Sequence, residues 1–227
     1  MSNVWDTLIL LQDYIIEKFN NSGEEIQEAG MEKFNHNTWI NRVWISEKYR
    51  RAHIDVVDAR DTKGLWMMHC CIFPHLHNDG PIFGLDVVAG KNKITGFFHD
   101  YSPTVNKEHD LIDDFTFSAN QLEWRKKREL PEWAKQIFNE DMISAGNIQS
   151  DEELEQILKF SHESIFNYLW SISDYNNNAN PEEVKNAHNR YAYYQKQNPH
   201  TPRTMTALGL NESDVNEFIK VCLFPEI

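Results

Sequence analysis

The sequence predicts an α+β fold, a three-layer α/β/α sandwich with a central antiparallel β-sheet, formed by residues 1–227 as a single domain. A helical hydrophobic period near the N-terminus gives way, from residue 38, to short apolar segments separated by turn-prone residues. The second half returns to helix signals. Because a helix followed by a strand meander and more helices can cover a sheet on both faces, we expect a sandwich.

The first helix is predicted over residues 5–19, where Leu8, Leu11, Ile15 and Phe19 recur at helical spacing. The polar residues that follow predict a loop. Strands are predicted for five apolar, β-rich segments, which are residues 38–46, 52–59, 65–73, 82–89 and 94–99. The turn-prone stretches 61–64, 78–81 and 90–93 separate the last four, which indicates an antiparallel meander.

Four helices are predicted in the second half. One spans residues 118–127. Ser150 and Glu153 form a capping box that opens a helix ending near residue 171. Asn180 and Pro181 supply an N-cap and a first-turn proline for the next helix. The last spans about residues 211–224.

Charge and composition exclude several classes of protein. The net charge of -13 opposes binding to nucleic-acid phosphates. We expect no membrane association, because no apolar run approaches the ~20 residues of a membrane span. The first residues lack the basic start of a secretion signal, and three sparse cysteines do not suggest a disulfide framework. We therefore expect a cytoplasmic protein, and a monomer.

Ionisable residues interrupt three of the apolar strands: Asp55, His69 and Asp86. If Ala59 pairs with Leu65 across the turn, Asp55 lies opposite His69, and the next hairpin can place Asp86 on the other side of His69. His53 would share that face. The row is either a proton-transfer site or a structural polar row, and the pattern alone leaves both open.

A zinc site is the competing chemistry, because His69, Cys70, Cys71, His75 and His77 lie close together in the sequence. Their spacing matches no common zinc motif, and adjacent strand cysteines point to opposite faces. We therefore predict no metal, and expect His75 and His77 to be loop residues.

Several separated blocks resemble the ferredoxin-dependent bilin reductases. They are residues 69–74 (HCCIFP), 81–90 (PIFGLDVVAG), 99–104 (HDYSPT) and 128–133 (RELPEW). The resemblance runs from about residue 49 to the C-terminus. It implies a bilin held between the sheet and the C-terminal helices, with biliverdin as substrate, reduced ferredoxin as electron donor and no bound cofactor. Protons would come from side chains through bilin radicals.

The resemblance also assigns roles to individual residues. Asp86 matches the family's central catalytic Asp, and His69 matches a His that bridges to it. Asp55 lies near the D-ring vinyl group. The implied substrate-binding residues are His53, Thr95, Arg128, Asn198, His200 and Thr201. Arg128 would pair with a propionate of the substrate.

Two departures from the family pattern bear on the product. Members that form phycocyanobilin carry Glu where this chain has Asp55, whose carboxyl would sit about 1.5 Å further back. Many members have an Asp where this chain has Pro199. The pattern resembles a phage-type branch related to the phycocyanobilin-forming enzymes, found in a bacterial or phage-infected host cell. It implies reduction of biliverdin IXα to phycoerythrobilin through 15,16-dihydrobiliverdin.

Three alternatives remain open: reduction to phycocyanobilin, a non-catalytic bilin carrier, and a small α+β scaffold protein with no ligand. For a ferredoxin partner, which is acidic, we expect a basic docking surface. The candidates are Lys48, Arg50, Arg51, Arg125, Lys126 and Lys127.

Overall fold

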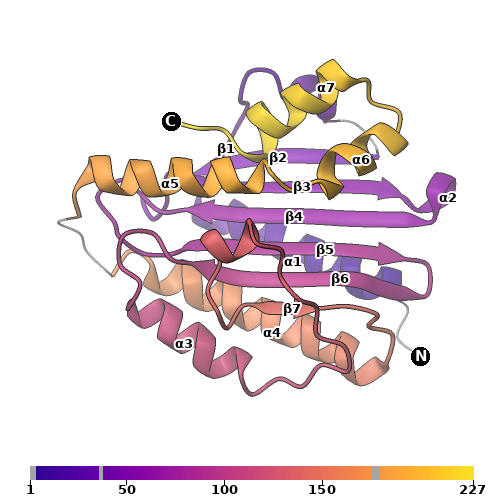
Figure 1. Ribbon diagram of the computed structural model, residues 1–227, viewed down its shortest axis with the longest axis horizontal. Helices are drawn as coiled ribbons and strands as arrows, with labels where there is room; N and C mark the ends of the chain where they lie inside the picture. Colours follow the sequence, from indigo (N-terminus) through magenta and orange to yellow (C-terminus); the bar gives the residue numbers. More distant parts are fainter. Residues whose placement is uncertain (1–3, 36–37, 175–178) are drawn as a thin grey trace.

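A seven-stranded antiparallel sheet runs through the middle of the molecule (Figure 1). The computed structural model describes residues 4–35, 38–174 and 179–227. The strands lie in sequence order, so the sheet is a continuous meander. They are β1 (Glu24–Ile26), β2 (Trp39–Ile45), β3 (Arg51–Ala59), β4 (Leu65–Phe73), β5 (Ile82–Gly90), β6 (Lys93–Ser102) and β7 (Ile143–Ala145).

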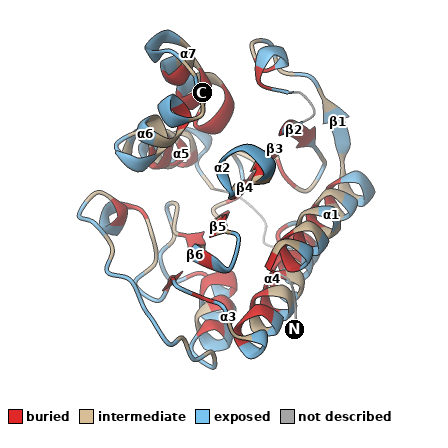
Figure 2. Cartoon of the chain, turned by 90° about the vertical axis from the view of Figure 1, so that its right-hand side faces the viewer, coloured by how far each residue is buried: buried red, intermediate tan, exposed pale blue. Residues whose placement is uncertain are grey.

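Helices cover both faces of the sheet, which confirms the predicted sandwich. Viewed end on, α1, α3 and α4 lie against one face, and α5, α6 and α7 lie against the other (Figure 2). The longer helices are α1 (Val4–Ser22), α3 (Asp110–Ala119), α4 (Asp151–Ser171), α5 (Pro181–Gln195), α6 (His200–Ala207) and α7 (Glu212–Glu217). The short ones are η1 (Glu32–Phe34), α2 (Arg60–Lys63), η2 (Ala134–Gln136) and the π-helical η3 (Phe218–Leu223). No helix among the described residues is long and apolar enough to cross a membrane.

The predicted capping residues open the helices where expected. The Ser150 hydroxyl accepts a hydrogen bond from the backbone N–H of Glu153, and the Asn180 side chain accepts one from the N–H of Glu182. Asn211 caps α7 in the same way. Each cap satisfies a backbone donor that the first helical turn leaves free.

Alternate residues of the central strands enter two separate apolar cores. On β4, Trp66, Met68 and Cys70 pack toward α1 and α4, whereas Cys71 and Phe73 pack toward α5 and η3. The alternation follows from the two-residue period of a strand. Because both faces are covered, ionisable residues such as Asp55 and His69 are held in a largely dry environment.

The predicted helix over residues 118–127 was wrong. The helix α3 covers Asp110–Ala119, with Leu111, Ile112 and Phe115 on its buried face. Residues 120–127 form turns and extended chain, and Lys127 makes an isolated bridge to Ala145 of β7. Strands β1 and β7 and helix α6 were not predicted, because these short elements depend on neighbouring segments more than on their own periodicity.

Candidate active site

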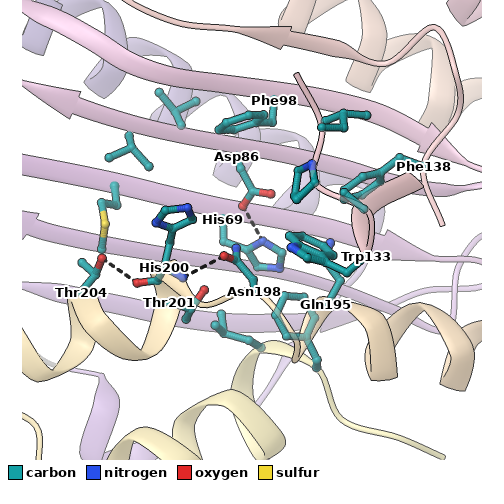
Figure 3. A pocket seen from close by; sticks show the side chains of 18 of the residues that line it. His69, Asp86, Phe98, Trp133, Phe138, Gln195, Asn198, His200, Thr201 and Thr204 are labelled. Carbon is teal, nitrogen blue, oxygen red and sulfur yellow. Dashed lines mark hydrogen bonds and ion pairs between the residues drawn. The ribbon is translucent and has the colours of Figure 1, made fainter. Parts of the chain in front are cut away.

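A cavity of about 510 Å³ lies between the sheet and the C-terminal helices. Strands β3 to β6 form its floor, α6 forms one wall, and residues 128–142 form another. In Figure 3, His69 and Asp86 rise from the floor, His200 and Thr201 face them from α6, and Trp133 and Phe138 stand at the opposite side. The volume suits a small organic ligand.

The predicted cross-strand row is present in the predicted register. Asp55 of β3 pairs with His69 of β4, which in turn pairs with Asp86 of β5. Nδ1 of His69 and Oδ1 of Asp86 are 2.7 Å apart (Figure 3). The His69 side chain is 10% exposed and that of Asp86 is 37% exposed. The carboxyl can therefore reach a ligand in the cavity while the imidazole supports it from below.

Burial and charge act in opposite directions on His69. Burial alone lowers the pKa of its imidazole, but the charge and hydrogen bond of Asp86, with a smaller effect from the Cys71 thiol, outweigh it. The pKa of His69 therefore lies well above its ordinary value. An imidazolium hydrogen-bonded to a carboxylate can both store and deliver a proton.

Asp55 lies at the edge of the same cavity and is almost fully buried. Burial raises the pKa of its carboxyl to about 7, and a hydrogen bond from Trp39 opposes part of the rise. The Trp39 indole N–H donates to Oδ2 at 2.6 Å. A carboxyl with this pKa can exchange protons near neutrality. Sequence reasoning missed Trp39, whose pairing with Asp55 requires that β2 lie beside β3.

His53 shares the face of the row but lies outside the cavity lining. Its Nε2 and the side-chain oxygen of Asn41 are 2.6 Å apart. Burial, followed by the charges of Arg51 and His69, holds the pKa of His53 well below its usual value. The imidazole is therefore neutral, and it can contact a ligand only through its neighbours.

The structure also brings the predicted rim residues Arg128, Asn198, His200 and Thr201 to the cavity. Arg128 is exposed, and its guanidinium lies over the ring of Phe98 at 5.3 Å. Thr95 lies outside the lining: its hydroxyl donates to the Val88 carbonyl. The Thr95 backbone carbonyl accepts a hydrogen bond from Arg128, so Thr95 helps to orient that side chain.

The apolar walls of the cavity are largely residues that sequence reasoning did not select. Trp133 and Phe138 contact each other edge to face, with ring centroids 6.0 Å apart. Phe224, near the C-terminus, packs edge-on against His69. Flat apolar rings suit a planar ligand. Trp133 belongs to the RELPEW block, which could have signalled its place at the site.

The expected basic docking surface needs correction. Arg51 is buried, with an ion pair to Glu28, and it is not available to a partner. Lys48 and Arg50 are partly buried and bond to the Leu169 carbonyl and to His188. Lys126 and Lys127 are exposed beside Arg128 at the cavity. The basic candidates therefore reduce to the run at residues 125–128.

Comparison with known proteins identifies the family. The profile of the ferredoxin-dependent bilin reductases matches residues 2–225. The chain belongs to this family. Phycocyanobilin:ferredoxin oxidoreductase of Synechococcus sp. (strain CC9902) is 29% identical over 192 residues, which cover 81% of this chain and 74% of the relative. The corresponding protein of Prochlorococcus marinus (strain MIT 9515) is 26% identical over 61% of this chain and 62% of its own.

Solved structures agree with this assignment of a bilin reductase. The structure of PcyX superposes with a TM-score of 0.74 at 36% identity, covering 97% of this chain and 99% of PcyX. Phytochromobilin synthase from tomato, solved in complex with biliverdin, gives a TM-score of 0.75 at 15% identity over 94% of this chain and 81% of its own. The second similarity shows the shared fold alone.

Proposed function

We propose that this bilin reductase reduces biliverdin IXα by four electrons to phycoerythrobilin, through 15,16-dihydrobiliverdin. The observation that carries the proposal is the His69–Asp86 pair, 2.7 Å apart on the floor of a tetrapyrrole-sized cavity with Asp55 beside it. Protonation of a tetrapyrrole makes it easier to reduce. A site that reduces a bilin therefore needs acids under the ring system, whereas a carrier does not.

The reaction consumes one proton for each electron. Ferredoxin delivers electrons singly, so each of the two double bonds receives two electrons and two protons, through radical intermediates. Asp86 is placed to protonate the ring system, and His69 to return a proton to Asp86 through their shared hydrogen bond. Solvent restores the protons of both groups between the reduction steps, because each turnover consumes four protons.

The substrate would lie flat between the floor and the aromatic wall. Arg128 at the rim has a guanidinium suited to a bidentate pair with a propionate. His200 and Thr201 at the start of α6 offer further polar contacts on the facing wall (Figure 3). Phytochromobilin synthase from tomato, which shares this fold, was solved in complex with biliverdin.

Asp55 is the basis for proposing phycoerythrobilin as the product. The Trp39 indole holds one oxygen of its short side chain at 2.6 Å, which restrains the carboxyl near the sheet. A proton donor set back in this way would leave the D-ring vinyl group intact. The pattern fits the phage-type branch of the family.

Phycocyanobilin is the second candidate product. The two cyanobacterial relatives carry that name and align with much of the chain. A substrate that settles deeper in the cavity could bring its vinyl group within reach of Asp55. The two products differ in which double bonds are reduced, so chromatography separates them.

Ferredoxin would approach the exposed basic run at residues 125–128. Lys126 and Lys127 lie beside Arg128, and Arg128 lines the cavity. A donor docked there would be close to the bilin. Because docking would depend on opposite charges, turnover should fall as ionic strength rises past ~0.15 M, where screening acts within about 8 Å.

Anaerobic turnover with biliverdin and reduced ferredoxin tests the function. A time-dependent blue shift of the visible band, followed by elution of phycoerythrobilin, supports the proposal. Phycocyanobilin as the final product would overturn the product assignment. A bound but static spectrum would show a carrier, and no spectral change on mixing would remove biliverdin as the ligand.

A further inference from the structure

A second cluster of reactive groups lies on the cavity-facing side of the sheet and includes His69 of the cavity lining. His53 of β3 pairs across the sheet with Cys71 of β4, and His69 stands two residues from Cys71 on the same face. One ring nitrogen from each histidine and the Cys71 sulfur all lie within 4.8 Å of one another. The three residues are buried: His53 and Cys71 have no exposed surface, and His69 as a whole residue is 8% exposed.

The other nitrogen of each imidazole is already anchored. Nε2 of His53 pairs with the side-chain oxygen of Asn41, and Nδ1 of His69 pairs with Asp86. The remaining atoms, His53 Nδ1 and His69 Nε2, are buried and have no hydrogen-bond partner within the described part of the chain. In metal sites, a histidine ligand usually donates its second N–H to a carboxylate or carbonyl, which fixes the ring.

We propose that His53, His69 and Cys71 form a binding site for a borderline-soft divalent cation, with Zn²⁺ as the best match. Two imidazole nitrogens and one thiolate are donors that zinc prefers, and three protein ligands leave a fourth position open. Binding forms two N–Zn bonds and one S–Zn bond, and two protons leave to solvent, one from the Cys71 thiol and one from Nε2 of the His69 imidazolium. When no bilin is bound, the cation would enter the site from the cavity, on the side where His69 lies.

The site shares His69 with the proton-transfer pair but uses the opposite ring nitrogen. The cation would contact Nε2 of His69, while Asp86 holds Nδ1 on the opposite side of the ring. Occupancy would therefore displace the Nε2 proton and block that nitrogen, so His69 could not take up a new proton there after passing one from Nδ1 to Asp86. The cation would act as an inhibitor of reduction, although its binding can be measured with no substrate or ferredoxin present.

Cobalt binding to the bilin-free protein provides the test. Co²⁺ takes the same ligands as Zn²⁺, and a thiolate ligand adds an intense near-ultraviolet charge-transfer band. Wild type should show this band at one cobalt per chain, and one equivalent of Zn²⁺ should remove it. Cys71→Ser should abolish the band and weaken Zn²⁺ binding at least ~100-fold, since even loss of an outer partner costs about 10–100-fold.

Cys70→Ser is the matched control, because Cys70 is equally buried but packs into the core on the opposite face. It should keep the band. The double change His75→Ala and His77→Ala removes a pair of loop imidazoles stacked 5.3 Å apart, which could bind metal at the surface. It should also keep the band.

Three results would overturn the site: no thiolate band in wild type, an undiminished band in Cys71→Ser, or a band lost in the His75/His77 variant. Asn41→Ala provides an independent check should Cys71→Ser prove unstable. It leaves all three ligands but frees the His53 ring, so zinc affinity should fall about 10-fold. Unchanged affinity in that variant would also count against the site.

Discussion

The two faces of the sheet both bury histidines, but they treat them differently. On the α4 side, Nδ1 of His99 donates to the Gly84 carbonyl at 2.6 Å, and Nε2 accepts from the Ser164 hydroxyl at 2.8 Å. On the cavity side, His53 and His69 each leave one nitrogen without a hydrogen-bond partner among the described residues. A buried polar group with every bond satisfied stabilises one structure. An unsatisfied group beside a cavity is available to a ligand or a proton.

Structural and functional polar residues therefore differ less in burial than in whether all of their polar atoms have hydrogen-bond partners. Burial lowers the pKa of His99 to about 4, so the ring is neutral and serves as a fixed donor and acceptor. His69, equally enclosed, has a raised pKa because Asp86 stabilises its charged form.

Asp86→Asn should stop reduction while the protein still binds bilin. The amide keeps the shape of the side chain but cannot deliver a proton, and loss of a general acid costs about 10²- to 10⁴-fold in rate. Single-turnover absorbance with reduced ferredoxin measures the rate, and a bilin titration measures binding. Asp58→Asn, on a carboxyl at the end of β3 that bonds to Arg60, is the control and should turn over normally. Full activity in Asp86→Asn would remove Asp86 from the mechanism.

Asp100 is a buried carboxyl on the cavity-facing side of the sheet, and both of its oxygens accept hydrogen bonds. Burial raises its pKa to about 7, against hydrogen bonds from Ser102, Asn139 and Tyr101. The folded state therefore keeps a proton that the unfolded chain has lost above about pH 4. Stability should fall as pH rises from about 4 to 7, by up to about 1.4 kcal/mol per pH unit.

Asp100→Asn should flatten this pH dependence. Urea unfolding of wild type and variant between about pH 4.5 and 7 isolates the contribution, because other titrating groups are common to both. Bilin reduction should continue in the variant, since Asp100 lies outside the cavity lining. Parallel stability curves for the two proteins would show that Asp100 is not protonated in the fold.

Ser164→Ala should cost stability without affecting the chemistry. The change leaves Nε2 of His99 buried and unpaired, which costs about 1–3 kcal/mol. Ser161, one turn earlier on α4, is also buried, but its hydroxyl has no hydrogen-bond partner in the described chain. Ser161→Ala should therefore be neutral or slightly stabilising. Equal unfolding free energies for the two alanine variants would contradict the distinction drawn between the faces.

Asp55→Glu should move products toward D-ring vinyl reduction. The added methylene extends the carboxyl toward the bilin, and a roughly tenfold change in product ratio corresponds to about 1.4 kcal/mol between competing barriers. Chromatography of the anaerobic products gives the ratio. Asp58→Glu makes the same change on a half-buried carboxyl of β3 outside the cavity lining and should leave the product ratio unaltered. An unchanged product ratio in Asp55→Glu would show that the length of the Asp55 side chain does not determine the product.

Much of the fold could be predicted because the strands carry a two-residue period and the helices carry strong caps. The pairing of Ala59 with Leu65 follows from the short intervening segment, and it fixes Asp55 opposite His69. The helix at residues 118–127 was misplaced because Leu122 and Trp124 pack against the core from irregular chain. The spacing of these apolar residues resembles that of a helix, although the chain there is irregular.

The sequence by itself determined that Asp55 lies opposite His69, because β3 and β4 are joined by a short turn and have little freedom to slip. The longer connection over residues 74–81 allowed Asp86 to lie on the other side of His69, and the structure fixed that pairing. Only the tertiary structure decided which of these groups have hydrogen-bond or packing partners. Trp39 beside Asp55, Asn41 beside His53 and Phe224 over His69 come from distant segments. The state of a buried charge depends on such contacts, since desolvation and hydrogen bonds set its pKa.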